Sequence, residues 1–130
     1  MKFEEDFVNE NPVEFQIDGR NFKYKPTTAG EETRWYPDYM EEIQVEENGQ
    51  MVTKHRQNLA KVTECKLLNL IEVPYDQEVI KKITGTDKAW KDMTKDERWK
   101  LMEKLNPAIF NKVLVKIKEI DSPNSNAIKN

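Results

Sequence analysis

Few side chains in this 130-residue chain have the chemistry of nucleophiles or metal ligands. His55 is the single histidine and Cys65 the single cysteine. Zinc sites combine several His or Cys ligands at short spacings, and neither residue has such a neighbour. Cys65 lies between Glu64 and Lys66 in a helical pattern, where a cysteine is more often a small core residue than a nucleophile. We therefore expect no metal site, no cofactor and no enzymatic activity.

The other charged groups do not form a recognisable reaction site. Three pairs of adjacent carboxylates occur, Glu31-Glu32, Glu41-Glu42 and Glu46-Glu47. Neighbours in sequence do not face each other on a helix, and none of the spacings is that of a calcium loop. No phosphate-binding or dinucleotide-binding glycine pattern is present in a chain with only four glycines. The acidic groups are therefore read as surface charges.

Basic residues gather near Lys54 and again near Lys116, but they do not predict nucleic-acid binding. The isoelectric point is about 5.3, and aromatic residues do not alternate with the basic ones as they do in single-strand binders. The charge is uneven, −8 over residues 1–50 and +5 over residues 51–130. Such a division is suited to head-to-tail association of identical subunits or to docking on a charged partner.

The composition predicts one folded domain with a small core. Charged residues make up 35% of the chain and hydrophobic residues 37%, so apolar surface is scarce for a chain of this length. The acidic start has no signal-peptide pattern, and no segment has the roughly 20 apolar residues that span a bilayer. We expect a cytoplasmic protein, in a bacterial host, with no membrane partner.

Alternating residues predict an opening hairpin over residues 13–25. Val13, Phe15 and Ile17 alternate with polar residues, and Asp18-Gly19 suits a two-residue type I′ turn. The remaining patterns predict helices at about 28–43, 54–72, 75–83, 95–105 and 107–120. The expected fold is α+β and mostly helical, with the hairpin packed on four to five helices in a single domain over 13–120. Residues 1–12 are predicted to be a flexible N-terminal arm and residues 121–130 a disordered tail.

The stretch from 41 to 56 supports two readings. Asn48-Gly49 is a strong turn dipeptide, and Ile43 and Val45 could pair with Met51 and Val52 in a second hairpin. Alternatively, the preceding helix runs to about Ile43 and a loop leads to the next helix. The sequence leans slightly towards a loop or a short ribbon.

Aromatic residues beside the first hairpin are the predicted binding surface. Trp35, Tyr36 and Tyr39 follow the hairpin closely. An isolated hairpin is marginal in water, so its apolar side needs a cover. We expect these three residues, with Phe22 and Tyr24 of the hairpin, to form or support a face that binds a protein partner.

The order of the segments resembles that of a known family. The ribbon FQIDGRNFKYKPTTAGEE leads to the acidic aromatic stretch TRWYPDYMEEI, then to KLLNLIEVPY and WKDMTKDERWKLMEKLNPAIFNKVLVKI. Over residues 13–120 this order is similar to the small tail-assembly chaperones of long-tailed bacteriophages and proviruses. The resemblance implies a non-enzymatic protein that binds the tape-measure protein, or a tail-tube protein, and keeps it soluble during tail assembly. The alternative is a minor structural component of the tail or virion, a ring-forming or connector protein.

Overall fold

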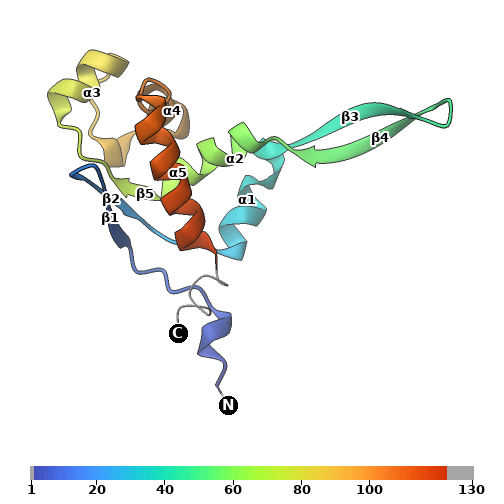
Figure 1. Ribbon diagram of the computed structural model, residues 1–130, viewed down its shortest axis with the longest axis horizontal. Helices are drawn as coiled ribbons and strands as arrows, with labels where there is room; N and C mark the ends of the chain where they lie inside the picture. The colour runs from blue at the N-terminus through green and yellow to red at the C-terminus, as the bar shows by residue number, and fades with distance from the viewer. Residues whose placement is uncertain (1, 123–130) are drawn as a thin grey trace.

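The computed structural model describes residues 2–122 and is an α+β protein. In this part of the chain, five α-helices accompany five strands that form two small, separate sheets. One sheet lies within the body of the molecule, and the other is a long two-stranded ribbon that projects from it (Figure 1). No helix in the described range is both long and apolar enough to cross a membrane.

The sheet in the body begins with a tight hairpin. Strands β1 (Val13–Ile17) and β2 (Arg20–Tyr24) pair in antiparallel fashion around Asp18 and Gly19. Both turn residues have positive φ, 49° and 81°, as a type I′ turn requires. The short strand β5 (Leu70–Glu72) pairs with the other edge of β2, so that β2 is the central strand.

Each helix starts at a residue whose side chain accepts a hydrogen bond from one of the free backbone N–H groups of the first turn. Thr28 and Thr94 form capping boxes with Glu31 and Glu97, at the starts of α1 and α4. The bounds are α1 (Ala29–Tyr39), α2 (Leu59–Lys66), α3 (Gln77–Thr84), α4 (Lys95–Met102) and α5 (Pro107–Asp121), with 3₁₀ turns η1 (Glu4–Asp6), η2 (Leu67–Asn69) and η3 (Trp90–Asp92). Helix α1 packs mainly on α2, α3 on α4, and α5 on β1.

Two of the predicted helices are wrong in extent. The helix expected at 28–43 ends at Tyr39, and strand β3 (Met40–Glu47) begins at the next residue. The helix expected at 54–72 is replaced at its start by β4 (Gln50–Gln57), so α2 begins only at Leu59. Of the two readings of 41–56, the second hairpin is the one observed, with Val45 opposite Val52.

The end of the predicted 54–72 helix is also wrong, because the chain leaves α2 and becomes strand β5. The guanidinium of Arg98 donates hydrogen bonds to the carbonyls of Leu67 (2.8 Å) and Leu68 (3.2 Å). The indole N–H of Trp90 donates to the carbonyl of Leu70 at 2.6 Å. Arg98 also stacks on Trp90, 4.9 Å from the ring centroid. These contacts satisfy carbonyls that a continuing helix would have bonded.

The core lies between the three-stranded sheet and the C-terminal helices. Its fully buried members include Tyr24, Leu67 and Leu70 from the sheet region and Met102, Val113 and Ile117 from α4 and α5. The sheet residues come from segments almost 50 positions apart, so the core depends on the pairing of β2 with β5.

The start of the predicted tail, Asp121 and Ser122, is ordered as the end and the C-cap of α5. Residues 2–12 include the turn η1 and expose Phe3 and Phe7. Asp121, expected in a disordered tail, is the last residue of α5 and accepts hydrogen bonds from the Thr27 N–H (2.9 Å) and the Tyr24 hydroxyl (2.8 Å). It also pairs with the Lys66 ammonium at 3.0 Å. The rest of the predicted tail, 123–130, lies outside the described residues.

Candidate interaction surface

The long ribbon, residues 40–57, is the part of the molecule that is most available to a partner. Its eight-residue strands β3 and β4 pair along their whole length around Asn48 and Gly49, whose φ values are 52° and 79°. Eight residues of strand extend about 25 Å. The strands contact each other extensively and the rest of the described chain little, and Figure 1 shows the turn far from the helices.

The ribbon has one face with apolar residues and one that is mainly polar. Opposite residues share a face and successive residues alternate, so Ile43, Val45 and Val52 lie together. We call these three residues the apolar stripe. They are half-buried, because two strands alone cannot cover them. The apolar stripe is thus only partly buried within its own molecule.

Two ion pairs lie on the same face of the ribbon as the apolar stripe. The Nε of Arg56 donates to the Glu41 carboxylate at 2.7 Å, and Lys54 pairs with Glu47. The hydrogen bond from Arg56 is the main cause that lowers the pKa of Glu41. Exposed pairs of this kind contribute little stability. Lys54 is opposite Ile43 and Glu47 lies beyond Val45 on the same face, so their ion pair spans the Val45–Val52 pair and shields part of the stripe.

Three of the predicted partner-binding residues lie at the base of this ribbon, on α1. Tyr36 is 51% exposed, Trp35 is half-buried and Tyr39 is buried. The rings of Tyr36 and Tyr39 meet edge to face with centroids 5.8 Å apart, and α1 is continuous across Pro37. Tyr36 is therefore the ring of this group that a partner would meet, and Tyr39 supports it from beneath.

The other two predicted residues are part of the core. Phe22 is 1% exposed and Tyr24 is completely buried. The Tyr24 hydroxyl lies 2.8 Å from both the Thr27 hydroxyl and the Asp121 carboxylate. Burial is the main cause that raises the pKa of Tyr24 well above its ordinary value. These two side chains stabilise the hairpin and do not reach the surface.

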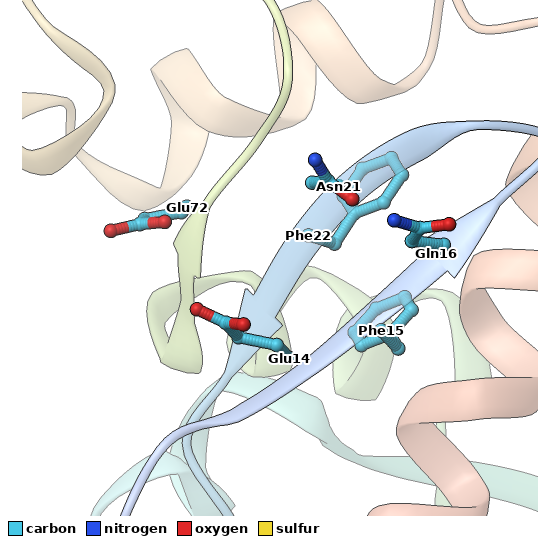
Figure 2. A pocket seen from close by; sticks show the side chains of 6 residues that line it. All are labelled: Glu14, Phe15, Gln16, Asn21, Phe22 and Glu72. Atoms are coloured by element: carbon cyan, nitrogen blue, oxygen red, sulfur yellow. The ribbon is translucent and has the colours of Figure 1, made fainter.

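A shallow depression of about 460 Å³ lies against the first hairpin (Figure 2). Its lining residues are Glu14, Phe15, Gln16, Asn21, Phe22 and Glu72. The ammonium of Lys23 lies 3.4 Å from the carboxylates of both Glu14 and Glu72. The lining contains carboxylates and amides but no thiol, hydroxyl or imidazole. Its two ionisable lining groups, Glu14 and Glu72, are thus both held by one ammonium.

The two candidate chemical residues, Cys65 and His55, lie on different elements and differ in burial. Cys65 is completely buried, and burial raises the pKa of its thiol, so the neutral form is favoured. His55 is exposed on β4. Within residues 2–122, no group of three or more His, Cys, Asp or Glu side chains is arranged to hold a metal ion.

Searches of protein families, curated proteins and solved structures found no match to this chain. The functional argument therefore depends on the surface itself.

The sequence analysis did not place the apolar stripe among the candidate partner-binding residues. Its signal was present, because Asn48-Gly49 is flanked by Ile43, Val45 and Val52 at alternate positions. The four glutamates of β3 weakened that signal, since Glu is depleted in strands and common in helices.

Proposed function

We propose that this protein is a non-enzymatic assembly chaperone that covers apolar surface on another protein. The observation that carries the proposal is the long ribbon, which holds Ile43, Val45 and Val52 away from the core of its own molecule. Tyr36, exposed at the base of the ribbon, extends the available surface. Because the ribbon cannot bury these side chains itself, a partner that covers them would remove apolar surface from water and stabilise the complex.

The partner class follows from the family resemblance. In a tail-assembly chaperone the client is the tape-measure protein or a tail-tube protein. A long helical client exposes apolar stripes before assembly, and a narrow apolar face on a ribbon can pack along such a stripe. The glutamates that flank the stripe keep the outer surface of the complex charged, which favours solubility.

The decisive experiment is co-expression with the candidate tape-measure protein, with the soluble fraction of the client as the readout. We expect the wild-type chain to increase that fraction. The triple variant Ile43→Thr, Val45→Thr, Val52→Thr should lose most of the effect. Threonine keeps the β-branched shape that favours strands, so the ribbon should persist while its apolar surface is lost.

Met51→Thr is the matched control. Met51 is 66% exposed on the opposite face of the same ribbon, so the change removes a similar apolar side chain without touching the stripe. It should leave the client soluble. A triple variant that folds normally and still solubilises the client as well as the wild type would refute the assignment of the stripe.

A further inference from the structure

The long ribbon consists of one acidic strand and one basic strand. β3 contains Glu41, Glu42, Glu46 and Glu47 and no basic residue, whereas β4 contains Lys54, His55 and Arg56 and no acidic residue. The two outer edges of the ribbon therefore carry charges of opposite sign.

Both edges are open to another strand. In an antiparallel pair every second residue turns its backbone N–H and C=O groups away from its partner. β3 and β4 pair only with each other among the described strands, and Figure 1 shows the ribbon clear of the body along most of its length. Uncovered edges of this kind pair readily with other chains unless charge prevents it.

We propose that the ribbon of one copy adds edge to edge to the ribbon of a second copy, with acidic β3 beside basic β4. Charge selects this pairing from the three that are available. β3 beside β3 would place glutamates next to glutamates, and β4 beside β4 would place Lys54 and Arg56 next to their own copies. Like charges on neighbouring strands are destabilising and opposite charges are favourable.

The charges that would cross the contact are available. Lys54 and Arg56 are ion-paired within the ribbon, yet their side chains remain 51% and 61% exposed, so each can reach a second carboxylate. The carboxylates of β3 on this same face are Glu41 and Glu47, whose side chains are 35% and 46% exposed.

The geometry of this pairing sets the form of the assembly. β3 runs away from the body and β4 runs back towards it. When neighbouring ribbons point the same way, β4 of one copy is therefore antiparallel to β3 of the next. Each contact leaves one acidic and one basic edge free, so the assembly closes as a ring or continues as a filament. The apolar stripes of successive copies would join on one face. The inference does not depend on the client, and it suits the chaperone role and the alternative role as a tail component.

Charge-exchange variants test the proposal in the full chain. The acidic-ribbon variant is Lys54→Glu, Arg56→Glu, and the basic-ribbon variant is Glu41→Lys, Glu47→Lys. The control is Lys91→Glu, Lys104→Glu, which makes the same change of charge as the acidic-ribbon variant at two exposed positions on the body. Mass in solution is measured by sedimentation velocity over a range of protein concentrations, at low and high salt.

For the wild type, we expect the average mass to rise with concentration at low ionic strength and to fall when salt screens the charges. Each ribbon variant should require at least about tenfold more protein for half-association, whereas the control should stay within about twofold of the wild type. An equimolar mixture of the two ribbon variants should associate again, because every contact between unlike variants places opposite charges side by side.

Three results would overturn the proposal. They are a wild-type chain that stays monomeric at every concentration, an acidic-ribbon variant that associates like the wild type, and a mixture that does not associate. Urea unfolding monitors the body of each variant. If a glutamate variant is destabilised, the neutral change Lys54→Gln, Arg56→Gln replaces it and should weaken association in the same direction.

Discussion

The two hairpins of this protein have the same turn and opposite surroundings. The first turns at Asp18-Gly19 and the second at Asn48-Gly49, with φ values that agree within a few degrees. The first hairpin gains a third strand and packs against α5. The second is longer and projects from the body with both edges open (Figure 1).

The difference lies in the side chains and not in the turn. Phe15 and Phe22 stack on the first hairpin with ring centroids 5.4 Å apart, and Phe22 and Tyr24 are buried. The second has Val45 opposite Val52 and is otherwise rich in charge. Turn residues thus specify where a hairpin forms, and the amount of apolar surface on one face determines whether it becomes part of the core.

The largest expected effect is from truncating one apolar residue in each hairpin. Phe22→Ala should lower the free energy of unfolding by about 3–5 kcal/mol, because it leaves a cavity in the core. Val45→Ala should lower it by less than about 1 kcal/mol, since the half-buried side chain contacts little beyond the ribbon. Urea denaturation measures both. Equal losses in the two variants would mean that the ribbon is part of the cooperative core.

The two turn glycines provide a smaller and cleaner test. Gly19 and Gly49 have φ values of 81° and 79°, and a Cβ at either position would meet open space. Alanine therefore adds only backbone strain, about 1–2 kcal/mol. Gly19→Ala should lower global stability by about that amount. Gly49→Ala should leave global unfolding unchanged and accelerate amide exchange only within residues 40–57, because the ribbon opens locally.

A still smaller effect should appear in the pH dependence of stability. Burial tends to raise the pKa of Glu31, beside the first hairpin, but the Lys25 ammonium at 2.8 Å and the Thr28 N–H at 3.0 Å outweigh it and hold the pKa below its ordinary 4.5. The unfolded chain then takes up the proton first. The stabilisation from Glu31 is present above about pH 4.5 and is lost as the pH falls through the lower, folded value.

Urea midpoints between neutral and acidic pH measure this contribution. Glu31→Gln should lower stability at neutral pH and reduce the loss on acidification. Glu41→Gln should reduce the loss on acidification much less, because the Glu41–Arg56 pair is exposed on the ribbon and contributes little stability. If the urea midpoint falls by the same amount on acidification in the wild type and in Glu31→Gln, this carboxylate does not contribute to acid sensitivity.

The two hairpins also differ in how much of them the sequence revealed. In the first, strong β-formers alternate with polar residues on both sides of the turn, so local preference and final structure agree. In the second, Met40, Glu41 and Glu42 have high helix propensity and directly follow a helix, which favours a longer helix. Asn48-Gly49 was the main signal for a hairpin instead. Because these helix-favouring residues made an extended helix plausible, the apolar stripe could not be assigned to one face of a strand pair from the sequence.

Strand β5 was harder still to predict. The segment around Leu70 is apolar on all sides, and such a run reads equally as a buried helix or a buried strand. The strand conformation depends on groups that are distant in the sequence. They are the edge of β2 at Lys23 and Tyr24, with which β5 pairs, and the guanidinium of Arg98, which binds the Leu67 carbonyl. Of the predicted partner-binding residues, the sequence could not separate Tyr36 from Tyr39, because their exposure depends on how α1 packs on α2.

The base of the ribbon has a consequence for how the molecule could change over evolutionary time. The Asn58 N–H donates to the Tyr39 carbonyl at 2.7 Å, directly below the pair Met40 and Gln57. This hydrogen bond marks the boundary between the ribbon and the body. Insertions or deletions within residues 40–57 therefore need not disturb the fold of the body. Deleting one residue from each strand would move the side chains beyond the deletion to the opposite face of the ribbon. Deleting two residues from each strand would leave them on their original face. The reach of the ribbon should therefore vary among descendants in increments of about 7 Å, two residues per strand at a time.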